Sequence, residues 1–254
     1  MNFLYRKKDV MTKKWYESWF DSPYYHILYK DRDMEEAAAF IDKLIAFLQP
    51  PSGAKIMDLA CGKGRHAFQL AEKGYDVTGL DLSPESIATA ERQCHPNLRC
   101  AVHDMREPYK ESYFDYIFSF FTSFGYFNDV EEDIKVLKSV WINLKPNGVY
   151  VMDFLNEAQV RRWLIPYEEK EVDGILFRIS KNIEGGFVYK NIKFVADNHS
   201  YSFTERVRLI NANEMKFLFQ QANLDIIHIF GNYQLEGFDV QKSPRLILIA
   251  KKDG

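Results

Sequence analysis

The segment Asp58–His66 reads DLACGKGRH, and it decides which fold this sequence predicts. A hydrophobic run ends at the acid, two glycines follow with the spacing G-x-G, and a helical pattern begins directly after them. A buried strand that passes through a glycine turn into a helix is typical of nucleotide-binding α/β proteins. The segment therefore predicts a nucleotide site, and other residues must identify the nucleotide.

Short apolar runs alternate with helical segments around that turn. We expect strands at 55–59, 76–81, 98–102, 114–119 and 149–154, and helices at about 33–48, 65–73, from Ser83-Pro84, and at 129–145. Such alternation predicts a parallel sheet with helices on both faces. Ligands of these sheets bind at the carboxyl ends of the strands, so functional residues are expected there.

Beyond residue 166 the sequence changes to the period of antiparallel strands. The stretch 201–209, YSFTERVRL, places Tyr201, Phe203, Val207 and Leu209 on one face. The pairs Gly185-Gly186 and Asp197-Asn198 fit the turns of a meander over about 174–209. Asn211 and Glu214 form a capping box for a further helix, and two strands at 224–230 and 245–250 close the chain.

These patterns divide the chain into an N-terminal aromatic segment (1–34), a nucleotide-binding core (35–165), an antiparallel insertion (166–210) and a C-terminal part that completes the core sheet (211–254). The 254 residues include 33 basic and 36 acidic side chains, so no global field favours nucleic acid or an anionic membrane. No window offers the roughly 20 apolar residues of a membrane span, and the N-terminus lacks a signal-peptide pattern. We expect a cytoplasmic protein, monomeric or homodimeric, with free thiols at Cys61, Cys94 and Cys100.

The glycine turn is compatible with a dinucleotide, because Ala67 can take the third glycine position of that pattern. Asp58 argues against a dinucleotide, since a carboxylate at the turn repels a pyrophosphate and suits a cationic ligand. Asp81 ends the second strand and can accept from ribose hydroxyls, while Asp104 follows the third strand and can accept from an adenine amino group. Three acids at successive strand ends indicate a nucleoside that carries a positively charged amino acid.

The residues of these strand ends resemble those of the class I S-adenosylmethionine-dependent methyltransferases. The similar stretches are IMDLACGKGRHAFQLAEKGYDVTGLDLS from residue 56, AVHDM from residue 101, FDYIFSFFTSFGYF from residue 114 and LKPNGVYVMDFLN from residue 144. The resemblance covers roughly 35–165 and continues into 211–250. It implies an α/β fold with a Rossmann-like, doubly wound seven-stranded sheet, to which this chain adds an antiparallel β insertion, and S-adenosylmethionine as cofactor.

The resemblance also implies roles for individual residues. Asp58, Ala60, Gly62 and Gly64 would line the methionine part, Asp81 the ribose, and Asp104 with Met105 the adenine, while Leu82, Ser119 and Phe120 complete the expected cofactor-binding set. Ala60 departs from the family's commonest pattern, which has glycine at that position. We expect His66 to be a surface or cap residue rather than a base, and no catalytic residue is assigned.

The segment before residue 30 is rich in aromatic residues: Trp15, Tyr16, Trp19, Phe20, Tyr24, Tyr25 and Tyr29. One interpretation is a helix that packs its aromatic side chains on the core. The other is a lid over the methionine end of the cofactor, with Tyr24, Tyr25 or Arg32 reaching the cofactor carboxylate. The resemblance favours the lid, because several small-molecule methyltransferases use such a segment.

The residues after the fourth strand limit the substrate class. SFFT at 119–122 lacks the prolines of enzymes that methylate amino groups of nucleic-acid bases. Phe120, Asp153 and Asn156 do not supply the magnesium ligands of catechol-type enzymes, so we expect no metal. The insertion has seven basic and seven acidic residues, which argues against a phosphate backbone as substrate. The sequence thus predicts N- or O-methylation of a small molecule; an RNA or protein methyltransferase and an inactive cofactor-binding protein stay open as alternatives.

Overall fold

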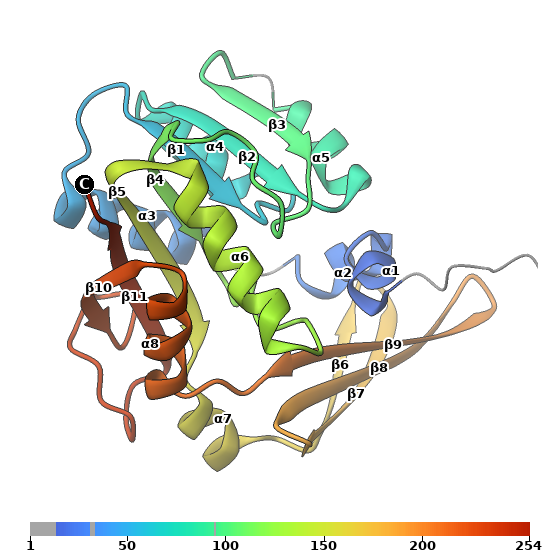
Figure 1. Cartoon of the computed structure of the whole chain (residues 1–254). Helices are drawn as coiled ribbons and strands as arrows, with labels where there is room; N and C mark the ends of the chain where they lie inside the picture. Colours follow the sequence, from blue (N-terminus) through green and yellow to red (C-terminus); the bar gives the residue numbers. More distant parts are fainter. Residues whose placement is uncertain (1–13, 31–33, 94) are drawn as a thin grey trace, which may run out of the picture.

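The computed structural model describes residues 14–30, 34–93 and 95–254, and its core is a seven-stranded sheet (Figure 1). The strand order is β10-β11-β5-β4-β1-β2-β3, and β11 pairs antiparallel with both β10 and β5, whereas the pairs from β5 to β3 are parallel. The bounds are β1 Lys55–Leu59, β2 Asp76–Asp81, β3 Leu98–Val102, β4 Phe114–Ser119, β5 Leu144–Leu155, β10 Leu224–Phe230 and β11 Arg245–Lys252. The predicted Rossmann-like seven-stranded sheet is therefore confirmed.

Helices cover both faces of this sheet, because successive residues of a strand point to opposite sides. The helices are α3 Met34–Leu48, α4 Arg65–Glu72, α5 Pro84–Glu91, α6 Val130–Asn143 and α8 Ala212–Gln221. Ile56 packs in one buried cluster with residues of α3 and α4, and Met57 packs in the other with residues of α6 and α8. No helix in the described part of the chain has the length and apolar character needed to cross a membrane.

Local signals place the helix ends where the sequence predicts them. Ser83 caps α5 by accepting the Ser86 N–H at 3.0 Å, and Pro84 is the first helical residue. Asn211 and Glu214 form the expected capping box of α8. Helix α6 ends two residues before the predicted end, because the backbone is already extended at Leu144 (φ −71°, ψ 138°), where β5 begins.

The insertion forms a separate antiparallel sheet in the order β6-β7-β8-β9, with bounds β6 Tyr167–Val172, β7 Ile175–Glu184, β8 Phe187–Ala196 and β9 His199–Arg208. Its turns contain Gly185-Gly186 and Asp197-Asn198, as predicted. Strand β6 and the short helix α7 (Glu157–Trp163) were not predicted. Two short helices, α1 (Trp15–Trp19) and α2 (Pro23–Leu28), lie against this sheet (Figure 1), and the sheet and both helices share a buried cluster that includes Trp19, Leu28 and Phe177.

Candidate functional site

A cavity of about 870 Å³ lies at the carboxyl ends of the parallel strands. One side is formed by the glycine turn after β1, the end of β2, the residues after β3 and the loop after β4. The other side is formed by α1, α2 and residues of β9. The core sheet and the insertion therefore enclose one common space, at the edge where α/β sheets bind ligands.

Asp58 presents a buried carboxyl group to this cavity. The residue is 1% exposed, and its Oδ2 atom has no hydrogen-bond partner in the described structure. Burial raises the pKa of Asp58 to about 7, and a hydrogen bond from the Ala67 N–H only partly opposes this rise. A buried acceptor without a partner is costly for a folded protein, so its position suits a cationic ligand that would satisfy it.

The two glycines of the turn differ in their surroundings. Both have a left-handed backbone, with φ +55° at Gly62 and +77° at Gly64. A Cβ on Gly62, which lines the cavity, would meet no atom within 4 Å, whereas a Cβ on Gly64 would lie 2.9 Å from the Ala90 Cβ. Gly62 thus leaves the cavity open, and Gly64 allows α4 and α5 to pack closely. Ala60 is also left-handed, at φ +61°, a conformation that favours glycine.

Asp81 connects the end of β2 to the glycine turn. Its Oδ2 atom accepts the Gly62 N–H at 2.8 Å, and its Oδ1 atom accepts the Ser83 N–H at 2.9 Å. Burial raises the pKa of Asp81 despite these backbone bonds. Since each carboxylate oxygen can accept more than one hydrogen bond, both retain capacity for a ligand hydroxyl.

A second contact near Asp81 ties the N-terminal helices to the core. Asp21, between α1 and α2, accepts a hydrogen bond from the Ser83 hydroxyl at 2.7 Å and from the Glu85 N–H at 3.2 Å. Its carboxylate therefore lies at the N-terminus of α5, where negative charge is favourable. This contact holds the junction of α1 and α2 beside the strand end that carries Asp81.

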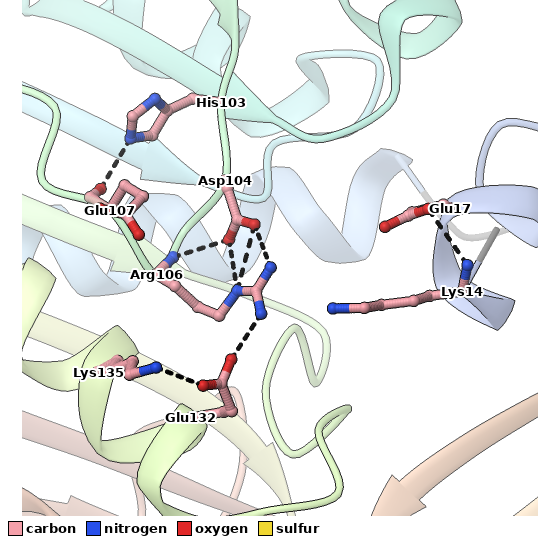
Figure 2. Close-up of polar contacts among 8 residues, drawn as sticks. All are labelled: Lys14, Glu17, His103, Asp104, Arg106, Glu107, Glu132 and Lys135. Carbon is pink, nitrogen blue, oxygen red and sulfur yellow. Dashed lines mark hydrogen bonds and ion pairs between the residues drawn. The ribbon is translucent and has the colours of Figure 1, made fainter. Parts of the chain in front are cut away.

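Asp104 has a cationic partner that the sequence analysis did not identify. The Arg106 Nε lies 3.0 and 3.2 Å from its two carboxylate oxygens, and Arg106 also pairs with Glu132, which Lys135 contacts in turn (Figure 2). Burial alone would raise the pKa of Asp104, but the bonds and charge of Arg106 outweigh burial and lower it. Asp104 lines the cavity, and its carboxylate is already paired with an arginine. Its contact with adenine stays a prediction.

The structure brings most of the other predicted residues to the cavity: Tyr25, Asp58, Ala60, Gly62, Asp81, Leu82, Asp104, Met105 and Phe120 line it. Gly64 and Ser119 lie behind the lining, and Ser119 is buried. Tyr24 does not line the cavity; it packs on Phe194 and Tyr201 and donates its hydroxyl to Asp197 at 3.2 Å. Arg32 lies outside the described residues.

The expectation for His66 was wrong, because the residue is neither on the surface nor a cap. It is 6% exposed, lines the cavity and stacks on Phe121 with 5.2 Å between ring centroids. Burial, with a smaller contribution from the charge of Arg65, lowers the pKa of His66 to about 3, so the imidazole is neutral. The cap position of α4 is taken by Gly64.

The loop after β4 has a strained backbone that a buried acid supports. Phe121 and Thr122 line the cavity with φ +56° and +67°. Asp153 of β5 accepts the Phe121 N–H at 2.9 Å and the Tyr233 hydroxyl at 3.1 Å on Oδ2, and Arg245 Nε at 2.7 Å on Oδ1. These partners come from distant parts of the chain, so no local signal in the sequence could have identified the network.

Sequence analysis also missed Glu205 of β9, which lines the cavity opposite the strand ends. Its side chain shares the face of Phe203 and Val207 by strand alternation. Its Oε1 atom accepts the Trp19 indole N–H at 2.7 Å and the Tyr29 hydroxyl at 2.6 Å. The signal that could have found it is the single acid in the apolar row of YSFTERVRL.

Comparison with known proteins agrees with this geometry. Residues 56–148 match the family model described as a methyltransferase domain. The chain is 27% identical to dTDP-3-amino-3,4,6-trideoxy-alpha-D-glucopyranose N,N-dimethyltransferase from Streptomyces venezuelae, over 82% of this chain and 91% of that protein. Residues 56–148 of this chain are thus similar to a methyltransferase domain.

Two further comparisons set the extent of this similarity. The putative methyltransferase YqeM from Bacillus subtilis is 36% identical, over 41% of this chain and 43% of the relative, so the match spans less than half of either protein. The fold of the whole chain is similar to the crystal structure of an S-adenosylmethionine-dependent methyltransferase from Clostridium acetobutylicum, with a TM-score of 0.77 at 21% identity, over 91% of this chain and 96% of that one.

Proposed function

We propose that this protein transfers a methyl group from S-adenosylmethionine to a nitrogen or oxygen atom of a small molecule. The observation that carries the proposal is one cavity that extends from the buried, unpartnered Oδ2 of Asp58 to the side chains of β9. An ammonium group would satisfy Asp58, and the rest of the cavity offers room for an acceptor beside it.

The described residues fit the chemical groups of S-adenosylmethionine. Asp58 would accept from the ammonium, Gly62 would admit the methionine part, and Asp81 would accept from the ribose hydroxyls. Met105 and Asp104 would contact the adenine. When bound, S-adenosylmethionine supplies an electrophilic methyl group on a sulfonium whose leaving group is neutral. The protein's contribution is then positioning and exclusion of water, for which the aromatic lining is suited.

The walls on two sides of the cavity support a small acceptor rather than a long polymer. Helices α1 and α2 and strand β9 bound the side opposite the strand ends, and Asp21 fixes the helices to α5. The relatives from Streptomyces venezuelae and Streptomyces fradiae, both named as N,N-dimethyltransferases of dTDP-linked amino sugars, support the same class. We further propose that the protein acts in the cytoplasm, as a monomer or homodimer.

Incubation with a metabolite extract and methyl-labelled S-adenosylmethionine tests the proposed function. Label should appear in a compound that passes an ultrafiltration membrane, and at limiting S-adenosylmethionine the Asp81→Ala variant should produce much less of it. Label retained with RNA or protein would support a macromolecular acceptor instead. Binding of S-adenosylmethionine without any transfer, across extracts from several growth conditions, would support an inactive binding protein.

A further inference from the structure

Glu205 occupies an unusual position for an acid. It lies on the apolar face of β9, its side chain is only 18% exposed, and it lines the large cavity. It also lines a second cavity of about 320 Å³, together with Val207 and Lys190. Burying a charged group among apolar side chains costs free energy, so a compensating role is expected.

Glu205 has an ion-pair partner in Lys190, and its hydrogen bonds use only one of its two carboxylate oxygens. Trp19 and Tyr29 both donate to Oε1, and an uncharged glutamine oxygen could accept the same two bonds. Lys190, directly opposite Glu205 on β8, forms an ion pair with it. Its Nζ lies 3.8 Å from Oε2, too far for a hydrogen bond, and it also contacts the Tyr29 hydroxyl and lies over the Tyr29 ring, 4.4 Å from the ring centroid. Lys190 lines the smaller cavity but not the larger one. Toward the larger cavity, Oε2 therefore keeps capacity to accept from a ligand.

The walls near Glu205 favour a cation. Tyr25 of α2 and Tyr29 directly after it line the cavity, as do Trp15 of α1 and Phe20 directly after that helix. The faces of aromatic rings attract cations, and more strongly where water is excluded. Among the described lining residues, six carboxylates face four lysines and arginines: Glu17, Asp21, Asp58, Asp81, Asp104 and Glu205 against Lys30, Lys63, Arg65 and Arg245.

We propose that Glu205 selects the acceptor by binding a cationic amine of the substrate. The inference rests on the proposed function and deepens it, since it names an amine-bearing molecule as the substrate class. Glu205 acts in recognition: its carboxylate holds the ammonium through Oε2, while Trp19 and Tyr29 fix the carboxylate through Oε1. The aromatic side chains of α1 and α2 complete the binding site around the ammonium.

Analogues of S-adenosylmethionine that keep the whole amino-acid part and carry an added arm in place of the transferred methyl group test this proposal without a known substrate. Because the amino-acid part is the same in every compound, its contact with Asp58 does not differ among them. The arms have graded lengths and end either in an ammonium or in a methyl group, and their affinities are measured by calorimetry. In the parent protein, the ammonium compound of the best length should bind at least about tenfold more tightly than its methyl counterpart, which corresponds to about 1.4 kcal/mol. Glu205→Gln keeps the acceptor for Trp19 and Tyr29 and should abolish this preference.

Two further variants make the comparison specific. Glu168→Gln removes an acid of β6 that pairs with Lys181 and lines neither cavity, so it should keep the full preference. Glu205→Asp keeps the charge on a shorter side chain and should prefer a longer ammonium arm. Equal binding of ammonium and methyl arms at every length in the parent, or an undiminished preference in Glu205→Gln, would overturn the proposal. Failure of all these analogues and of S-adenosylhomocysteine to bind would overturn the proposed function itself, and this inference with it.

Discussion

At the scale of single residues, Asp58 combines burial, a carboxyl group without a partner at Oδ2 and a pKa raised to about 7. A raised pKa means that the folded, ligand-free protein retains a proton between about pH 4 and 7 that the unfolded chain has lost. Asp58 therefore lowers the stability of the ligand-free protein as the pH rises through this range. The same residue is suited to bind an ammonium once it is ionised, so its cost to the fold and its role in binding have one origin.

Affinity for S-adenosylmethionine should rise as the pH increases through about 7, because the ligand's ammonium favours the ionised form of Asp58. We expect a gain of up to about tenfold per pH unit below the pKa, measured by calorimetric titration in buffers from about pH 6 to 7.5. Asp58→Asn should bind more weakly with a flat profile over the same range. Equal pH dependence in the parent and the variant would contradict the role of Asp58.

The two turn glycines should separate binding from stability. Gly62→Ala places a methyl group in open cavity space, so S-adenosylmethionine affinity should fall at least about tenfold, with a stability loss of about 1–2 kcal/mol from the left-handed backbone. Gly64→Ala adds contact with Ala90 to the same backbone cost and should lose about 1–3 kcal/mol more. Denaturant unfolding and calorimetry of both variants measure the two effects. Weaker binding in Gly64→Ala than in Gly62→Ala would show that the assignment is reversed.

At the scale of secondary-structure elements, sequence and structure agree best where the signals are local. The bounds of β1 to β4 match the prediction residue for residue, because each is a short run of mostly apolar residues between polar or turn-forming segments or aromatic flanks. Strand β6 reads YEEKEV and was missed, since it is a charged edge strand that exists through its register with β7. Helix α7 was also missed, although Asn156 caps it and Glu157 begins it.

The contact between Asp21 and α5 gives the N-terminal helices a testable part in ligand retention. Asp21→Ala removes the acceptor for the Ser83 hydroxyl and the Glu85 N–H, so the junction of α1 and α2 loses its anchor at the cofactor side. We expect S-adenosylmethionine to dissociate about tenfold faster, as measured by stopped-flow fluorescence of the nearby tryptophans. The tenfold change in rate is expected because charge-assisted hydrogen bonds of roughly 1.5–3 kcal/mol are lost. Asp197→Ala, which removes the partner of Tyr24 away from the cavity, is the matched control. Identical dissociation rates in the two variants would argue that α1 and α2 only pack on the small sheet.

At the scale of the whole molecule, the site depends on contacts between segments that lie far apart in the sequence. The strand-end acids were predictable, because parallel strands bring Asp58, Asp81 and the residues after β3 to one edge. Glu205 and the network of Asp153 were not, since their partners lie up to 186 residues away in the chain. Both interpretations of the aromatic segment find support: Trp19 is buried against the insertion, whereas Tyr25 lines the cavity.

Methyl transfer should not require a divalent metal. Asp153 of β5 already accepts hydrogen bonds from Phe121, Tyr233 and Arg245. Asn156 caps α7 and donates to the Ser243 carbonyl oxygen. Once an acceptor is known, the rate in excess chelator should equal the rate with added magnesium. A rate that collapses in chelator and returns with magnesium would refute this prediction.

The central claim is that the end of β2 holds the ribose of S-adenosylmethionine, and it depends on strand assignment, topology and cofactor together. The most direct measurement is calorimetric titration of the parent and of Asp81→Ala with S-adenosylmethionine and with its 2′-deoxy analogue. Asp81→Ala removes two charge-assisted contacts of roughly 1.5–3 kcal/mol each and also the acceptor for the Gly62 N–H, so affinity should fall at least about tenfold. The parent should discriminate against the deoxy analogue, and the folded variant should not. Equal discrimination by both proteins, or tight binding of NAD by the parent in place of S-adenosylmethionine, would contradict the account.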